Sequence, residues 1–257
     1  MHWLQDTLSD PWFRQLALGT LGISLASFLL LALPWTLIAR LDPACLRRHK
    51  IQQTPFPPGL WFWPSLRQLA VNALVMAVLL VLAWPLMRHL PIHTGALPPA
   101  WLIVLQLAFF VLLDDFLYYW MHRAMHRGWL LRHVHSVHHR IRQTTAINGN
   151  YMHPLEFALT GTLALAGPVL TGAHLHVLWL WIAIRQFEAV DAHCGYQLPW
   201  SPVHWLPGYD GAGYHDFHHA RYRGNYAGFF GYMDRWLGTQ ARGFADWRRE
   251  RRRAPEA

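Results

Sequence analysis

The feature that most constrains this chain is a long uncharged segment near its N-terminus. Residues 16–38 read LALGTLGISLASFLLLALPWTLI and carry no charged side chain. A helix needs roughly 20 apolar residues to cross the ~30 Å hydrocarbon core of a bilayer, and this segment is long enough. Because lipid offers the backbone no hydrogen-bond partners, only helices or closed barrels can cross it. We therefore expect a helical membrane span here.

Further apolar segments repeat this signal along the chain, at residues 69–87, 101–120, 155–171 and 175–188. Asp114 and Asp115 interrupt the end of the second of these, and Gly167, Pro168 and Gly172 favour a break before the last one, so the final pair could be tilted or re-entrant. With 53% hydrophobic and 14% charged residues, the chain is more apolar than an ordinary soluble domain. The sequence predicts an all-α integral membrane helical bundle with about four to five hydrophobic spans, formed by residues 1–257 as one domain.

Positive charge indicates which side of the membrane the connecting segments face. Arginine and lysine follow the first span in ARLDPACLRRHK, and five arginines follow the third, at positions 123, 127, 132, 140 and 142. Short loops rich in these residues usually face the cytoplasm. We expect residues 121–154 and 189–240 to form a cytoplasmic metal-binding cap, with residues 241–257 as a basic tail on the same side. The membrane would be the inner membrane of a bacterium or the endoplasmic reticulum of a eukaryote.

The net charge of +8 also indicates a class of partner. On so apolar a background, anionic membrane lipids are the expected partners of the basic segments, and a nucleic acid is not.

Histidine is concentrated in three short motifs that fall on the same expected face. From the first histidine of each motif the others follow at offsets of three or four residues, which place side chains on one face of a helix or turn. Imidazole nitrogen binds iron, zinc, copper or nickel in preference to calcium or magnesium, and eight donors exceed the needs of one open metal site. The sequence therefore predicts two metal ions, bound by His122 and His126, by His135, His138 and His139, and by His215, His218 and His219.

Two single histidines and four acids stand close to these motifs. His193 follows the fifth apolar segment and is expected to be a further ligand, and His153 precedes the fourth and is a weaker candidate. An all-imidazole site would be strongly cationic, so nearby carboxylates should orient the rings or offset the charge. The candidates for that role are Asp115, Glu156, Asp191 and Asp216. For Asp191 and Asp216, helix capping or pairing with arginine is an equally good interpretation.

Two non-enzymatic interpretations compete with catalysis. A metal transporter should place its ligands near the middle of the bilayer, in the two halves of a repeat. These motifs lie at one face, and the sequence shows no repeat. A structural zinc site would need only four ligands. Both interpretations leave most of the histidines unexplained.

The motifs resemble those of the fatty acid hydroxylase and sterol desaturase superfamily, most closely its C4-methylsterol oxidase group. The matching segments are DFLYYWMHRAMH, HSVHH, HPLE, DAHCGYQLPWSP and HDFHHARYRGNYAGFFGYMDRWLGT, with HKIQQ as a weaker match. The resemblance covers roughly residues 50–239 and carries the eight clustered histidines over as metal ligands. It also supports His193 and, less closely, His153.

The resemblance implies a centre of two iron ions, with zinc as a substitute in isolated protein, that uses O2 as a cosubstrate. The implied reaction is hydroxylation of a lipid or sterol C–H bond, and desaturation with the same centre is the alternative. The electrons would come from a separate donor, either a cytochrome b5-like protein or a ferredoxin with its reductase. The part of the sequence before Lys50 predicts only one clear span, and we expect no attached cytochrome b5-like domain.

Overall fold

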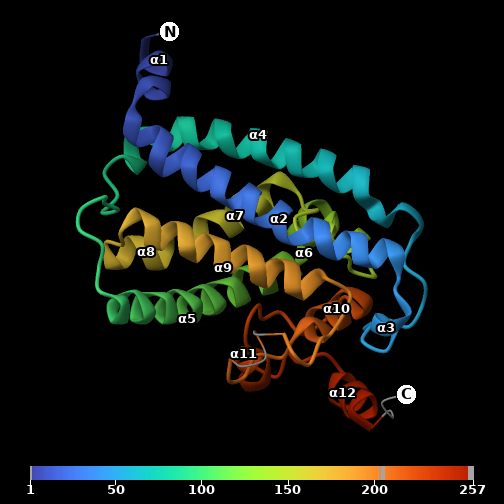
Figure 1. Cartoon of the computed structure of the whole chain (residues 1–257). Helices are drawn as coiled ribbons and strands as arrows, with labels where there is room; N and C mark the ends of the chain where they lie inside the picture. Colours follow the sequence, from blue (N-terminus) through green and yellow to red (C-terminus); the bar gives the residue numbers. More distant parts are fainter. Residues whose placement is uncertain (1, 202, 204–205, 254–257) are drawn as a thin grey trace.

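The computed structural model describes residues 2–201, 203 and 206–253 (Figure 1). All regular elements in this part of the chain are helical, as the sequence predicted. The long helices are α2 (Thr20–Leu41), α4 (Phe62–Met87), α5 (Ala100–Met125) and α9 (Leu175–His193), and the pair α7 (Pro154–Ala164) and α8 (Ala166–Thr171) breaks at Leu165. The shorter helices are α1 (His2–Ser9), α3 (Ala44–Arg47), α6 (Gly128–Leu130), α10 (Ala212–Arg221), α11 (Tyr232–Trp236) and α12 (Phe244–Arg253), and single turns are η1 (Phe13–Gly19), η2 (Pro58–Trp61), η3 (Leu131–His135), η4 (His138–Arg140) and η5 (Ala146–Asn148).

Among the described residues, four helical segments are long and apolar enough to cross a membrane: Phe13–Leu41, Pro58–Met87, Ala100–Met125 and Pro154–Thr171. Much of their apolar surface faces outward; Leu30 is 75% exposed and Leu86 is 80% exposed. Such surface is costly in water and is stable against lipid tails. The chain is therefore a multi-pass membrane protein, and its fold confirms the predicted helical bundle.

The fifth apolar segment has a different role. Helix α9 is not among the helices with the composition of a span, and nine of its residues are buried, including Trp181, Glu188 and His193. Helix α2 makes its most extensive packing contacts with α9, and α8 packs on α5 (Figure 1). The segment at residues 175–188 therefore forms the centre of the bundle, where α9 returns the chain to the end at which α5 finishes.

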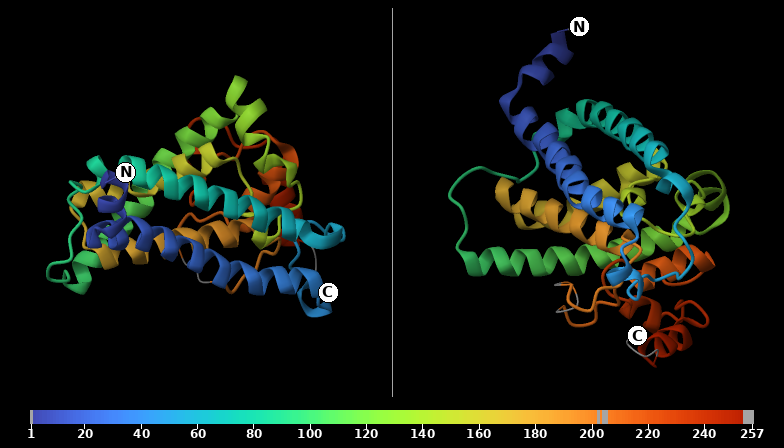
Figure 2. Two further views of the ribbon diagram at one scale, coloured as in Figure 1. Left: turned by 90° about the horizontal axis from the view of Figure 1, so that it is seen from above. Right: turned by 45° about the vertical axis from the view of Figure 1, so that its right-hand side comes forward.

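The bundle directs several chain segments to one end. Helix α5 continues five residues past the predicted position 120, to Met125, and its last turns bury Tyr119, His122 and Met125 under the C-terminal segment. The polar side chain of Asn72 on α4 holds the loop before α7, donating a 3.0 Å hydrogen bond to the carbonyl of Met152. All views place α1 and the segment α10–α12 at opposite ends of the molecule (Figures 1 and 2). Part of the basic tail, residues 254–257, lies outside the described residues.

Candidate metal centre

The structure gathers nine histidines into two adjacent groups. In each group the ligand-capable atoms all lie within 4.8 Å of one another. Group one contains His122 and His126 from α5, His135 from η3, His139 from η4 and His218 from α10. Group two contains His138 from η4, His193 from α9, and His215 and His219 from α10.

The spacing of the Nε2 atoms fits metal coordination. In group one, Nε2 of His126 lies 2.9 Å from that of His135 and 3.2 Å from that of His218. In group two, Nε2 of His215 lies 3.1 Å from those of His193 and His219. With metal–nitrogen bonds of ~2.1 Å, ligand nitrogens lie about 3.0 Å apart in an octahedron and about 3.4 Å apart in a tetrahedron. The distances thus match the edges of two coordination polyhedra.

Backbone carbonyls hold the rings in the tautomer that coordination requires. Nδ1 of His122 lies 2.8 Å from the carbonyl oxygen of Tyr226. Because a carbonyl can only accept a hydrogen bond, Nδ1 carries the hydrogen and donates it. Four other rings are held in the same way, with acceptors at 2.6–3.0 Å: His138 by Tyr151, His193 by Ala189, His218 by Gly224 and His219 by Ile141. An Nδ1–H leaves Nε2 with a free lone pair. Lone pairs directed at each other at these distances repel, and a cation between them removes the repulsion.

The same groups are kept uncharged by their surroundings. Burial lowers the pKa of His135 to about 3, and burial with the neighbouring His138 lowers the pKa of His193 to about 3. Burial also lowers the pKa of His138, and burial with adjacent imidazoles lowers those of His215, His218 and His219. The rings are therefore neutral near pH 7, which is the form that binds metal. Together these features fit a di-metal site.

A glycine and an asparagine after α10 have a structural role that the sequence did not reveal. Gly224 has a φ of 81°, and a Cβ there would lie 2.6 Å from the backbone of Ala241. This close approach delivers the Gly224 carbonyl to Nδ1 of His218. Asn225 fixes the same turn by accepting from the Ala241 amide at 2.8 Å and donating to the Tyr214 carbonyl at 3.2 Å. The RGNY segment therefore orients one ligand ring.

One of the four predicted acids touches a ligand ring directly. Oε1 of Glu156 lies 2.7 Å from Nδ1 of His135, and both side chains are buried. Asp115 instead accepts backbone hydrogen bonds from Phe229 and Phe230, at 2.8 and 3.2 Å, and so positions the loop that follows Tyr226.

The two remaining acids connect loops around the histidines. Asp191 accepts from the Tyr209 hydroxyl at 2.5 Å and from Ser201 at 3.3 Å. Asp216 accepts from the Thr144 hydroxyl at 2.7 Å and from Gln52 at 2.8 Å. These contacts tie α9 and α10 to the surrounding segments, so they act on ligand-bearing helices rather than on a single ring.

His153 does not join either group. It stands at the N-cap of α7, where its Nδ1 accepts a 3.1 Å hydrogen bond from the amide of Leu155. Its expected role as a tenth ligand is not supported by this position, because the capping geometry turns its ring toward its own helix. His193, the other single histidine, does lie in group two.

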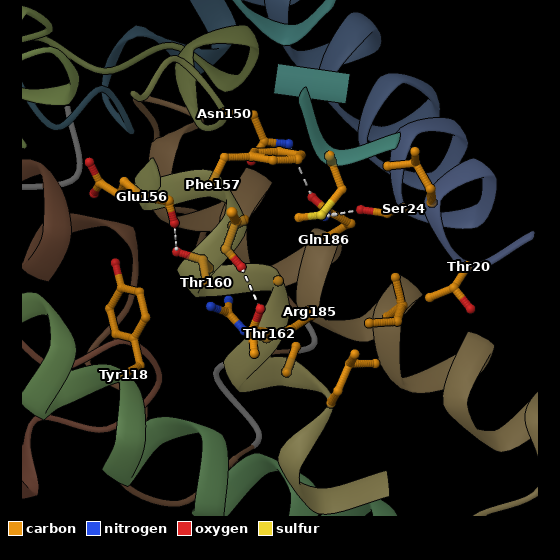
Figure 3. Close-up of a pocket in the computed structure, with 18 of the residues that line it drawn as sticks. Thr20, Ser24, Tyr118, Asn150, Glu156, Phe157, Thr160, Thr162, Arg185 and Gln186 are labelled. Carbon is orange, nitrogen blue, oxygen red and sulfur yellow. Dashed lines mark hydrogen bonds between the residues drawn. The ribbon is translucent and has the colours of Figure 1, made fainter. Parts of the chain in front are cut away.

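An apolar chamber of about 490 Å³ runs from group two into the helix bundle (Figure 3). His138, His193 and His215 line its inner end, and side chains of α2, α4, α7 and α9 form its walls. The volume lies in the range of small-molecule sites. Figure 3 shows that polar side chains, including Tyr118, Arg185 and Gln186, interrupt the apolar wall.

Comparison with known proteins matches this architecture to one family. A model of the fatty acid hydroxylase family matches residues 106–239, which carry all nine clustered histidines. The chain belongs to the fatty acid hydroxylase family. It is therefore a membrane oxidoreductase of that family, as the motifs predicted.

Relatives of this fatty acid hydroxylase family member carry two kinds of name. The chain is 39% identical over 216 residues to the very-long-chain aldehyde decarbonylase GL1-11 of Oryza sativa subsp. indica, and the aligned region covers 82% of this chain and 80% of the relative. It is 36% identical over 231 residues to methylsterol monooxygenase 2-2 of Arabidopsis thaliana, covering 88% and 86%. Methylsterol monooxygenase 2-1 of the same plant is 35% identical over 243 residues, covering 88% and 89%. No solved structure matches.

The sequence interpretation missed one buried charge cluster of this hydroxylase family member. Arg185 Nε lies 2.7 Å from Asp114 Oδ2, and Arg185 Nη1 lies 2.6 Å from Glu188 Oε2, with all three side chains at most 11% exposed. The guanidinium also stacks near the rings of Tyr118 and Phe229. Charges within apolar helices are a signal of functional or structural use, and the Arg185 and Glu188 pair in the fifth apolar segment carried that signal.

Proposed function

We propose that this protein is an O2-dependent di-iron monooxygenase that hydroxylates an unactivated C–H bond of a sterol or another long lipid. The observation that carries this proposal is the junction of an apolar chamber with group two, through His138, His193 and His215. A chamber opening onto metal ligands inside a membrane bundle would present a lipid carbon to the centre. The first substrate to test is a 4-methylsterol, because two of the similar proteins are named methylsterol monooxygenases.

The two histidine groups would hold one iron ion each. Nitrogen ligands suit iron as well as zinc, so zinc could replace iron in purified protein. When bound, the iron pair supplies the reduction of O2 and the removal of hydrogen from the substrate. Zinc has no redox chemistry, and zinc-loaded protein should be inactive.

The protein's own residues perform the remaining tasks. The backbone carbonyls and Glu156 hold the ligand rings, and the walls of the chamber orient the lipid and exclude water. The overall reaction converts a C–H group, O2, two electrons and two protons into an alcohol and water. A separate electron donor, a cytochrome b5-like protein or a ferredoxin with its reductase, is proposed to supply the electrons.

We further propose that the histidine groups and the C-terminus face the cytoplasm. The arginines that follow α5 lie at the end of the bundle that carries both groups, and basic connecting segments usually stay on that side. The host membrane would be the inner membrane in a bacterium or the endoplasmic reticulum in a eukaryote. Anionic lipids at that surface are proposed partners of the basic segment that follows α2 and of the basic tail.

Two alternative reactions use the same site. Desaturation would begin with the same hydrogen abstraction and end with loss of a second hydrogen. A reaction on a long-chain aldehyde is favoured by the 39% identity to a protein named very-long-chain aldehyde decarbonylase. The three reactions change the mass of the substrate differently.

Lipid mass spectrometry of expressing cells tests the proposal. Cells containing the wild-type protein, His138→Ala or His133→Ala are supplied with 4-methylsterols or long-chain aldehydes and with an electron-donor system. His133 is an exposed histidine outside both groups, so His133→Ala is the matched control. We expect a product heavier by one oxygen from the wild type and control only. A product lighter by two hydrogens would identify a desaturase, and a hydrocarbon with one carbon fewer would identify a decarbonylase.

A further inference from the structure

The two histidine groups face different surroundings. The chamber is lined by three members of group two and, within the described part of the chain, by no member of group one. All four members of group two are buried, whereas His126 of group one is partly exposed. Group one is thus the group nearer the outer surface of the cap.

A half-buried tyrosine covers group one on that side. The ring of Tyr222 lies 4.2 Å from the ring of His139 and 6.0 Å from that of His126. Tyr222 has a φ of 68° and ends α10, where its amide donates a 2.7 Å hydrogen bond to the His218 carbonyl. A non-glycine residue is strained in this left-handed backbone region, so the surrounding contacts must hold it there. The result is a ring that joins group one to the surface.

In the sequence, exposed arginines flank this tyrosine and the two histidines that it contacts. Residues 116–155 and 217–233 contain no Asp or Glu, so these segments carry only positive charge. The hydrogen bond between His219 and the Ile141 carbonyl brings the two segments together. Arg142 lies close to Tyr222: burial raises the pKa of the tyrosine, and the positive charge of Arg142 partly opposes that rise. We name this surface the arginine face, and define it by Arg127, Arg140, Arg142, Arg221 and Arg223, all exposed. Within the described residues, none of these five forms an ion pair.

We propose that the arginine face is the docking site of an acidic one-electron carrier protein. This inference rests on the proposed function, which needs two electrons for each product. An unpaired basic surface attracts an acidic protein and orients it. Docking there would place the carrier's redox group against Tyr222 and group one, while the lipid occupies the chamber beside group two. Each carrier molecule is oxidised by one electron, and two carriers supply one turnover.

Binding measurements on the purified protein in detergent test this proposal directly. The probes are the soluble haem domain of cytochrome b5 and a plant-type [2Fe–2S] ferredoxin, both acidic carriers. The test variant is the double charge reversal Arg140→Glu/Arg223→Glu. The control is Arg48→Glu/Arg88→Glu, which reverses two exposed arginines that form no ion pair within the described residues and lie outside both the face and the candidate membrane spans.

We expect the test variant to weaken binding of one probe by at least ~10-fold at low salt, and the control by less than ~2-fold. The loss should shrink as added salt screens the charges. The probe that responds identifies the carrier class. Equal affinities of the wild type and the test variant for both probes would overturn the proposal. So would a loss of binding confined to phosphatidylglycerol vesicles, which would make the face a lipid-binding surface.

A second measurement separates this inference from the proposed function. Each protein is reduced with dithionite, freed of the excess reductant because dithionite consumes O2, and then mixed with O2; the test variant should form product in this single turnover at the wild-type rate, whereas with the carrier it should be slower. If neither protein forms product after this chemical reduction, the proposed function fails, and the binding result still decides the docking site. A variant that is slow with both reductants would contradict a role confined to docking.

Discussion

Glu156 on α7 and His135 on η3 meet through a 2.7 Å contact between Oε1 and Nδ1, and both side chains are buried. This is the one carboxylate contact made directly with a ligand ring among the four acids that the sequence singled out. A carboxylate at Nδ1 fixes the ring's orientation and makes Nε2 a stronger donor. It also places a carboxylate beside a group in which backbone carbonyls hold two of the other rings, those of His122 and His218.

Replacing Glu156 with alanine should therefore weaken metal binding at group one. We expect Glu156→Ala to lower the affinity ~10–100-fold, the usual cost of removing such a partner. Competition against a chelator measures this affinity. Glu250→Ala, at an exposed acid of α12, is the control and should retain the wild-type affinity. Equal metal retention by both variants would show that the contact does not support the ligand.

Removing one ligand should empty one group and spare the other. His138→Ala leaves three histidines in group two and all five in group one, so we expect the metal content to fall from about two ions per chain to about one. His153→Ala should keep about two, because His153 caps α7 and lies outside both groups. Elemental analysis of purified protein measures both. Metal loss from His153→Ala would show a ligand role that its position does not indicate.

The sequence predicted which histidines gather, but it did not predict how they divide. The spacing of His122 and His126 predicted that they lie together, and they do, because α5 continues to Met125 and His126 caps its last turn. The neighbours His138 and His139 separate into different groups, because consecutive side chains of the turn η4 point in different directions. A spacing rule treats such a motif as one unit. The division depends on which segment packs against each side of the turn.

Other features depended on contacts that no local pattern records. The role of Gly224 arises from its approach to Ala241, and the role of Asp115 from amides more than a hundred residues away. The apolar segments were correctly identified as helices, yet α9 proved to be central and charged at Arg185 and Glu188. Hydropathy measures average composition, so it does not distinguish a central helix from one that faces lipid.

The lowered histidine pKa values predict how stability depends on pH in the metal-free protein. His135 and His193 have pKa values of about 3 in the folded state, against an ordinary 6.5. Below about pH 6.5 the unfolded chain therefore binds more protons than the folded protein. The stabilising contribution is complete above that pH and is lost as the pH falls from about 6.5 toward 3.

Thermal unfolding in detergent tests the predicted loss of stability with falling pH. The midpoint temperature of the metal-free protein should fall as the pH is lowered from about 7.5 to 5, a range in which exposed carboxylates remain mostly ionised. His193→Gln should show a smaller fall, because one contributing imidazole is absent. A midpoint that stays constant or rises toward pH 5 would contradict the prediction.

The ion pairs of Arg185 predict a specific pattern of destabilisation. Arg185→Met leaves the buried carboxylates of Asp114 and Glu188 without their cation, and breaking a buried pair in this way costs ~3–5 kcal/mol. Adding Asp114→Asn and Glu188→Gln to the same chain should restore much of the stability, since no buried charge then remains. Thermal midpoints of the single and triple variants measure the difference. Equal midpoints would show that the cluster's charges are not coupled.

Adjacent positions on α7 allow the chamber to be blocked without disturbing the metal groups. Ala158 lines the chamber, whereas Leu159 is 38% exposed on the outer side of the helix. Ala158→Phe should fill part of the space that the lipid occupies, and we expect product formation to fall at least ~10-fold with metal content unchanged. Leu159→Phe adds a similar ring to the outer surface and should retain wild-type activity. Product assays with metal analysis compare the two variants. Full activity of Ala158→Phe on every lipid substrate tested would show that the substrate reaches group two by another route.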